Sequence, residues 1–128
     1  MDSKKLAQLC RELADNKKAE DLLVLEVKDI SSITDYFVIA SGSREPHLRA
    51  IAHEITDKLE DEYGVKPRAE DGSLQTGWLV IDFFDVIVHV MRKDVRERYD
   101  LESLWGDAPK VKPPRPASPR PRKKPAGS

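Results

Sequence analysis

One short segment of this sequence has the residue types and the position needed for chemistry on a phosphate group. Ser41-Gly42-Ser43 lies between a predicted strand and a predicted helix, where backbone amides can bind phosphate. A nucleotidyltransferase also needs carboxylates at positions i and i+2 of a strand, because these side chains share a face and can hold a divalent metal. The acidic pair associated with a predicted strand, Asp82 and Asp85, is three residues apart across a turn. The spacing therefore argues against this enzyme and favours a capping turn.

The histidines and the single cysteine have no spacing typical of a metal or catalytic site. His47 and His53 are six residues apart on a predicted helix and lie on different faces, and His89 lies within an apolar strand. Cys10 falls on the apolar face of a predicted helix, and no nearby His or Lys would lower the pKa of its thiol. We expect structural roles for all four residues and predict neither a metal nor a cofactor.

An aromatic hairpin is the third candidate site. Trp78 begins a predicted strand that ends in the turn Asp82-Phe83-Phe84-Asp85, where glycine, asparagine or aspartate would be usual. Large rings in such a turn either pack beneath a neighbouring element or bind a partner, since Trp and Phe are typical anchors of protein interfaces. Spacing alone leaves both interpretations open.

The charges divide the chain into two parts. Residues 1–107 hold 15 basic and 23 acidic residues, a net charge of −8, whereas residues 108–128 hold seven basic residues and no acid. Seven of the nine prolines also lie in this last part, so we predict a disordered tail. Its bases suit either non-specific attraction to phosphates or a solvated spacer. They are Lys110, Lys112, Arg115, Arg120, Arg122, Lys123 and Lys124.

Composition excludes several classes of protein. With 128 residues, 39% of them apolar, the chain can build one core of ordinary size, which we assign to residues 1–107. No apolar run approaches the roughly 20 residues that cross a bilayer, and the N-terminus is amphipathic, unlike a signal peptide. One cysteine allows no intrachain disulfide. We therefore expect a soluble protein that stays in the cytoplasm.

Two helices are predicted from apolar residues at helical spacing. The first opens the chain with Asp2 or Ser3 as its N-cap. The second is long: Ser43 can cap its start, Pro46 lies in its first turn, and Gly64 ends it. Its apolar stripe consists of Leu48, Ile51, Ala52, Ile55, Leu59 and Tyr63.

Five strands are predicted, at residues 22–27, 36–41, 65–69, 78–83 and 86–91. The last two form an antiparallel hairpin that turns near Phe84, and Pro67 places the third at an edge. A strand, helix, strand unit normally returns parallel, so we predict an α/β domain with a mixed five-stranded sheet flanked by helices. Residues 94–105 then form short helical turns. Their inward side chains should be Val95, Tyr99, Leu101 and Leu104.

Residues spread over nearly the whole body resemble the ribosomal silencing factors, also called the Iojap-like or RsfS family. The matching segments are Ser31-Ser32-Ile33-Thr34-Asp35-Tyr36-Phe37-Val38-Ile39, Ser41-Gly42-Ser43, His47, Ala50-Ile51-Ala52, Trp78-Leu79-Val80-Ile81-Asp82, Asp85-Val86-Ile87-Val88-His89-Val90, Arg96, Tyr99-Asp100-Leu101-Glu102 and Leu104-Trp105. Together they are far more specific than any single short motif.

The resemblance implies a nucleotidyltransferase-like domain without catalysis. Such proteins bind ribosomal protein L-fourteen on the large ribosomal subunit, block joining of the small subunit and repress translation when nutrients are scarce; organellar relatives serve large-subunit assembly. The strand that begins with the family's tryptophan belongs to the docking region. We therefore expect Trp78, Asp82, Phe83 and Phe84 to bind the partner, although many relatives have glycine at the position of Phe84.

Two points are not implied by the resemblance. Many relatives end near Trp105 or Pro109, so the role of the tail cannot be transferred; we hypothesise that its seven basic residues contact ribosomal RNA. A free domain could also cover its docking face in a homodimer. The alternative function is a nucleotidyltransferase-like enzyme, which the missing carboxylate pair disfavours.

Overall fold

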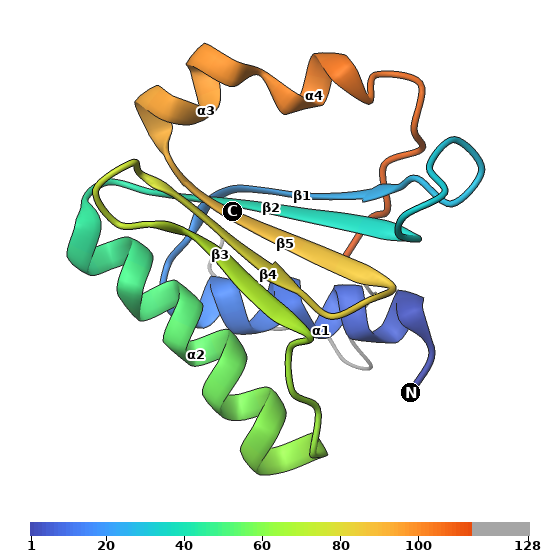
Figure 1. Ribbon diagram of the computed structural model, residues 1–128, viewed down its shortest axis with the longest axis horizontal. Helices are drawn as coiled ribbons and strands as arrows, with labels where there is room; N and C mark the ends of the chain where they lie inside the picture. Colours follow the sequence, from blue (N-terminus) through green and yellow to red (C-terminus); the bar gives the residue numbers. More distant parts are fainter. Residues whose placement is uncertain (114–128) are drawn as a thin grey trace, which may run out of the picture.

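The protein folds as a five-stranded sheet with helices on both faces (Figure 1). The computed structural model describes residues 1–113. Its elements, in chain order, are α1 (Ser3–Asn16), β1 (Glu20–Glu26), β2 (Tyr36–Gly42), α2 (Glu45–Tyr63), β3 (Ala69–Ser73), β4 (Trp78–Asp82), β5 (Val86–Arg92), α3 (Lys93–Tyr99) and α4 (Leu101–Leu104). The strand order is β1-β2-β5-β4-β3, with β2 and β5 parallel and the other neighbours antiparallel. The predicted α/β fold with a mixed sheet is confirmed.

The first helix begins and packs as its sequence predicts. The carboxylate of Asp2 accepts a hydrogen bond from the Lys5 amide at 2.7 Å, which satisfies one of the free N–H groups of the first turn of α1. Leu6, Cys10 and Leu13 are buried on the side that faces the sheet. In residues 1–113, no helix is long and apolar enough to span a membrane.

The second helix ends as predicted but begins differently. Gly64 adopts the left-handed conformation (φ 67°) that allows the chain to leave the helix, and Pro46 lies in the first turn. The predicted cap at Ser43 is wrong, because Arg44 is the N-cap and its side chain makes no capping hydrogen bond. The Ser43 amide instead donates to Nδ1 of His47 at 3.1 Å.

The edge strand lies further along the chain than predicted. β3 covers Ala69–Ser73, whereas the prediction was residues 65–69. Pro67 has no amide proton to donate, and pairing with β4 begins where the Arg68 amide donates to the Asp82 carbonyl at 2.7 Å. The short turn at residues 74–77 connects β3 to β4 and fixes their register, in which the last pair is Ser73 with Trp78. These contacts impose an extended conformation on a polar segment that has no strand pattern of its own.

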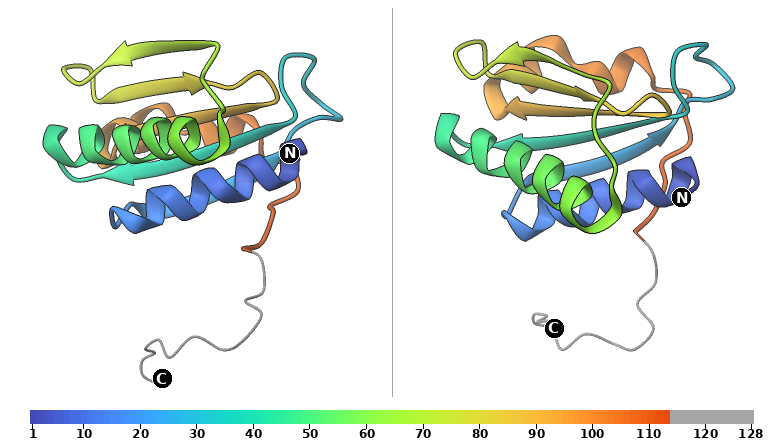
Figure 2. Two further views of the ribbon diagram at one scale, coloured as in Figure 1. Left: turned by 90° about the horizontal axis from the view of Figure 1, so that it is seen from below. Right: turned by 60° about the horizontal axis from the view of Figure 1, so that its bottom comes forward.

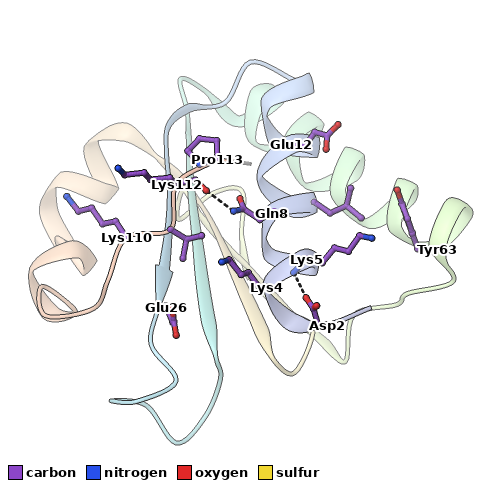
Figure 3. A pocket seen from close by; sticks show the side chains of 12 residues that line it. Asp2, Lys4, Lys5, Gln8, Glu12, Glu26, Tyr63, Lys110, Lys112 and Pro113 are labelled. Carbon is purple, nitrogen blue, oxygen red and sulfur yellow. Dashed lines mark hydrogen bonds between the residues drawn. The ribbon is translucent and has the colours of Figure 1, made fainter. Parts of the chain in front are cut away.

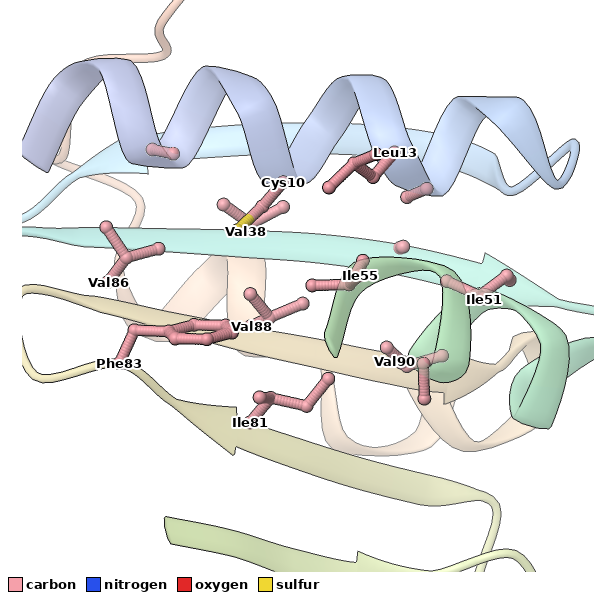
Figure 4. Packing of buried hydrophobic residues seen from close by; sticks show 14 of the residues in the cluster. Cys10, Leu13, Val38, Ile51, Ile55, Ile81, Phe83, Val86, Val88 and Val90 are labelled. Carbon is pink, nitrogen blue, oxygen red and sulfur yellow. The ribbon is translucent and has the colours of Figure 1, made fainter. Parts of the chain in front are cut away.

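The two faces of the sheet carry separate hydrophobic clusters. Figure 2 shows α1 and α2 side by side on one face. Between them and the sheet lies the larger cluster, to which Val38, Ile51, Val88 and Phe83 contribute (Figure 4). α3 and α4 lie on the opposite face (Figure 1), where Val95 and Leu101 pack on residues of β1, β2 and β5.

Two residues of the last helical region point outward instead of inward. Val95 and Leu101 are buried as predicted, but Tyr99 is 52% exposed and Leu104 is 73% exposed. Asp100 adopts a left-handed conformation (φ 48°) and separates α3 from α4. This break shifts the phase of the helical repeat, so one periodicity cannot assign the inward side chains of both helices.

The segment after α4 returns to the sheet and covers the free edge of β1. Ala108 is buried, the Glu26 amide donates to the Pro109 carbonyl at 2.9 Å, and the Val111 amide donates to the Val24 carbonyl at 2.8 Å. We call residues 108–113 the C-terminal strap. They lie within the stretch predicted as a tail, just after the predicted domain boundary at residue 107, whereas residues 114–128 lie outside the described part of the chain. Pairing with the strap closes the end of β1, from Val24 to Glu26, which would otherwise be an open edge.

Candidate functional site

The segment Ser41-Gly42-Ser43 is built into the fold instead of forming an open phosphate cradle. The buried Ser41 hydroxyl accepts a hydrogen bond from Arg96 Nη1 at 2.8 Å. A Cβ atom at Gly42 would lie 2.9 Å from the Leu48 side chain, so the chain packs tightly there. The Ser43 amide is already bonded to His47. These contacts support the interpretation of a structural turn.

The carboxylates near the hairpin are not arranged for metal binding. Asp82 accepts hydrogen bonds from Arg68 Nη2 and from the Phe84 amide, both at 2.8 Å. Partial burial opposes ionisation, but these two hydrogen bonds and the charge of Arg68 hold the pKa of Asp82 below its usual value. Asp85 is exposed and follows the turn. Within residues 1–113, no three His, Cys, Asp or Glu side chains are grouped so that they could hold a metal ion.

His47 and Cys10 have the structural surroundings expected of them. The His47 ring connects the Ser43 amide to the Lys17 carbonyl, which lies 2.8 Å from Nε2. Complete burial raises the pKa of the Cys10 thiol far above its usual value. A thiol kept protonated in an apolar core is a poor nucleophile.

The two phenylalanines of the hairpin point in different directions. Phe83 is only 7% exposed and packs in the cluster beneath α1 and α2 (Figure 4), so the surface does not present its ring. Phe84 is 59% exposed and has a positive φ of 83°, which is unusual for a residue with a side chain. The Arg68 guanidinium lies 4.1 Å from the centre of the Phe84 ring. Because Arg68 also binds Asp82, it ties the exposed ring to the end of β4.

Trp78 lies at the margin of α3, on the same face of the sheet. Its half-buried ring lies 5.1 Å from that of Tyr99, measured between centroids. The indole Nε1 donates to Nδ1 of His89 at 3.0 Å. His89 is 8% exposed, and burial lowers its pKa to about 4, so its ring is neutral near pH 7. The aromatic side chain is therefore held from two sides and still reaches the surface.

Strand alternation places further residues on this surface. Trp78, Val80 and Asp82 share one face of β4, and Ile87 lies directly opposite Asp82 on β5. Val80 and Ile87 are half-buried, since α3 packs mainly on β2 and β5 and leaves the β4 side partly open. We call this surface the aromatic face. Its members are Trp78, Val80, Asp82, Ile87 and Tyr99.

Sequence reasoning missed three members of the aromatic face. Val80 could have been found, because it follows Trp78 by two residues on the same strand. Ile87 depends on the register of the hairpin, and Tyr99 depends on where α3 crosses the sheet. Neither of these facts is visible in the apolar pattern. Phe84 follows the end of β4, and its exposed ring is linked to Asp82 of this surface through Arg68, which contacts both.

A second feature lies at the opposite edge of the sheet, between α1 and the C-terminal strap. It is a groove of about 800 Å³ lined by Lys4, Lys5, Lys110 and Lys112 together with the acidic residues Asp2, Glu12 and Glu26 (Figure 3). Gln8 Nε2 donates to the Lys112 carbonyl at 2.7 Å and fixes the strap beside the helix. We call it the lysine groove. The remaining predicted tail residues, Arg115, Arg120, Arg122, Lys123 and Lys124, lie outside the described residues.

Comparison with known proteins identifies the family. The family model described as "Ribosomal silencing factor during starvation" matches residues 1–128. The chain is 45% identical over 111 residues to ribosomal silencing factor RsfS of Halalkalibacterium halodurans, covering 87% of this chain and 94% of that protein. It is also 35% identical over 94 residues to the mouse protein named mitochondrial assembly of ribosomal large subunit protein 1, covering 70% of this chain and 40% of that longer protein.

A solved structure has the same fold. A crystal structure of a protein from Chromobacterium violaceum superimposes with a TM-score of 0.78 at 31% identity, covering 83% of this chain and 88% of that one. The chain that carries the aromatic face and the lysine groove thus belongs to the family of ribosomal silencing factors.

Proposed function

We propose that this protein binds the large ribosomal subunit through ribosomal protein L-fourteen, blocks joining of the small subunit, and so represses translation when nutrients are limited. Family membership supports a regulatory role, and the name of the mouse relative connects this domain to the large subunit. Such a protein works in the cytoplasm, where the ribosomal subunits meet. When it is free, a second copy can cover the same face in a homodimer.

The aromatic face is the observation that carries the proposal. Trp78 and Tyr99 form an aromatic pair on the open side of the sheet, and the half-buried Val80 and Ile87 lie nearby on the same face. Aromatic rings that are already held by their neighbours lose little entropy on binding, and a few such anchors dominate the affinity of an interface. A contact of standard size, roughly 800 Å² on each partner, is sufficient for tight binding. The remainder of the domain then occupies the space of the small subunit.

The proposed mechanism is steric and uses no catalysis. The Ser41-Gly42-Ser43 turn is occupied by internal contacts, and Asp82 is engaged by Arg68 and by the Phe84 amide. Both features support a structural use of the residues that a nucleotidyltransferase would employ. What the function requires is a rigid body, which the sheet with its two hydrophobic clusters supplies.

The lysine groove and the tail supply a second contact, to ribosomal RNA. Lys110 and Lys112 of the strap lie with Lys4 and Lys5 of α1 around one groove, and five further basic residues follow in the sequence. Their attraction to phosphates is independent of sequence and is screened by salt. It adds affinity, whereas the aromatic face selects the partner protein.

The decisive experiment compares Trp78→Ala with Ile33→Ala. Ile33 is an exposed apolar residue (69%) between β1 and β2, outside both the aromatic face and the lining of the lysine groove, and so is a suitable control. We expect Trp78→Ala to bind large subunits about 10- to 100-fold more weakly in co-sedimentation and to lose inhibition of subunit joining, whereas Ile33→Ala behaves like the unchanged protein. The proposal fails if the subunits join equally well with and without an excess of the unchanged protein.

The RNA contact is tested with a full-length variant in which the five bases beyond the strap become Gln. These residues are Arg115, Arg120, Arg122, Lys123 and Lys124. Because the strap itself is unchanged, the edge of β1 stays paired. We expect the logarithm of the affinity for large subunits to fall less steeply with the logarithm of salt, by roughly 0.7–0.9 for each phosphate that the variant no longer neutralises. Identical salt slopes would exclude RNA binding by these residues.

A further inference from the structure

His89 is a buried polar side chain that contacts the Trp78 ring of the proposed docking face. It lies diagonally across from Trp78 on the neighbouring strand, since Trp78 pairs with Met91 and His89 pairs with Val80. Its Nδ1 accepts the only hydrogen bond that an indole ring can donate, at 3.0 Å. The polar group of Trp78 is therefore satisfied inside the protein.

The His89 ring is held in one orientation and one tautomer. Because Nδ1 accepts a hydrogen bond from the indole N–H, the proton of the neutral imidazole lies on Nε2. Nε2 is buried and has no hydrogen-bond partner among the described residues. The imidazole also packs edge-to-face against Phe37, at 5.1 Å between centroids and an interplanar angle of 87°. Phe37 in turn packs against Trp105.

Leaving a buried donor unpaired is unfavourable. The structure nevertheless keeps Nε2 unpaired, and a His89 ring flipped by half a turn would lose the hydrogen bond to Trp78. The arrangement makes sense if the bond at Nδ1 is what the site requires. The half-buried Trp78 ring, fixed in this way, reaches the surface without a free hydrogen-bond donor.

We propose that His89 is a positioning residue: it occupies the indole N–H of Trp78, fixes the ring, and makes the aromatic face specific for an apolar side chain of the partner instead of a hydrogen-bond acceptor. This inference rests on the proposed function, because it assigns a role to a residue behind the same docking face. Tyr99, whose ring lies 5.1 Å from that of Trp78 between centroids, adds a second contact to the ring.

Two substitutions at position 89 separate this role from simple packing. His89→Asn keeps an acceptor at the branch where Nδ1 lies, whereas His89→Leu keeps a branched side chain of similar width without an acceptor. We expect His89→Leu in the full chain to bind large subunits about 10-fold or more weakly in co-sedimentation, and His89→Asn to stay within about 3-fold of the unchanged protein. Equal losses in both variants would overturn the inference.

Fluorescence reports the ring directly. The chain has two tryptophans, so a Trp105→Phe background makes Trp78 the only one. In this background we expect His89→Leu to shift the Trp78 emission to longer wavelength and to lower its anisotropy, because the freed N–H turns toward water. An emission spectrum and anisotropy that do not respond to His89→Leu would overturn the inference.

A double-mutant comparison covers the case in which His89→Leu is simply less stable. Trp78→Phe keeps a ring but has no N–H, so His89→Leu should change binding by less than about 2-fold in that background. A full loss in the Trp78→Phe background, or tighter binding of His89→Leu in the natural background, would overturn the inference. Trp78→Ala distinguishes failure of the proposed function from failure of this inference. If Trp78→Ala binds large subunits like the unchanged protein, the proposed function fails. If Trp78→Ala loses affinity and His89→Leu does not, only the role of His89 is wrong.

Discussion

Arg68 and Asp82 are joined twice, through the backbone and through their side chains. The Arg68 amide donates to the Asp82 carbonyl at 2.7 Å, and Arg68 Nη2 lies 2.8 Å from a carboxylate oxygen of Asp82. The same guanidinium covers the Phe84 ring at 4.1 Å from its centroid. The beginning of the β3 pairing is thereby connected to the hairpin tip that projects from the proposed docking face.

Replacing Phe84 separates binding from stability at this tip. We expect Phe84→Gly to change the free energy of unfolding by less than about 1 kcal/mol, because relief of the left-handed conformation offsets the loss of the ring and the greater freedom of the unfolded chain. Denaturant unfolding measures this change. Affinity for large subunits should fall several-fold, since the exposed ring is removed.

Phe84→Ala is the matched control, because it removes the ring and keeps the unfavourable conformation at position 84. It should bind as weakly as Phe84→Gly and unfold more easily than the glycine variant. Full affinity in both variants would show that the tip does not contact the partner.

The buried His89 makes stability depend on pH. Its pKa is about 4 in the folded protein and near 6.5 in the unfolded chain, so the unfolded state binds the proton more readily. The stabilisation is complete above pH 6.5 and is lost as the pH falls toward 4. Between pH 7.5 and 4.5 we expect His89→Asn to lose roughly 2–3 kcal/mol less stability than the unchanged protein. Parallel curves for the two proteins would contradict this prediction.

Cys10 should react with thiol reagents only when the domain unfolds. Its side chain is fully buried on the side of α1 that faces the sheet, and burial raises the pKa of the thiol. The rate of modification by a disulfide reagent should therefore follow the fraction unfolded as denaturant increases, and stay negligible in buffer. Fast modification in buffer, with the circular dichroism of the folded protein unchanged, would show that α1 opens locally.

The sequence predicts the elements that have an apolar pattern of their own. β2 and β5 are buried apolar runs and α2 has an apolar stripe at helical spacing, and the positions predicted for all three agree with the structure within one or two residues. β3 has no such pattern, because Ala69–Ser73 is mostly exposed and its place is set by pairing with β4. Local propensity cannot reveal a strand whose conformation is imposed by its neighbour.

The sequence likewise predicts only part of the candidate site. The sequence points to Trp78 and to an unusual turn, but it cannot tell which phenylalanine packs inside. The structure separates them, since Phe83 continues the face of Ile81 into the core while Phe84 leaves the strand with a positive φ. The contact between Trp78 and Tyr99 joins residues that are distant in the chain, so no local pattern encodes it.

The C-terminal strap depends on Arg11, a residue that the apolar pattern of α1 does not explain. Arg11 is 9% exposed, and its Nη2 donates to the Val111 carbonyl at 2.9 Å. Desolvation lowers the pKa of its guanidinium, and the hydrogen bond to the strap compensates in part for its burial. We expect Arg11→Met, which keeps the apolar stem, to destabilise the domain by about 1–2 kcal/mol.

Hydrogen exchange shows whether this loss is local to the strap. In Arg11→Met, the amides of Glu26 and Val111, which form the hydrogen bonds between β1 and the strap, should exchange faster than in the unchanged protein. The exchange rates of amides in β2 and β5 should rise only as much as the global loss of stability requires. Arg49→Met on α2 is the control, because Arg49 is exposed and should leave exchange unaltered. Equal acceleration at every amide would mean that the strap opens only with the whole domain and that Arg11 supports the core in general. Acceleration confined to Glu26, Val111 and their neighbours would establish the strap as a separately opening unit that positions Lys110 and Lys112 beside α1.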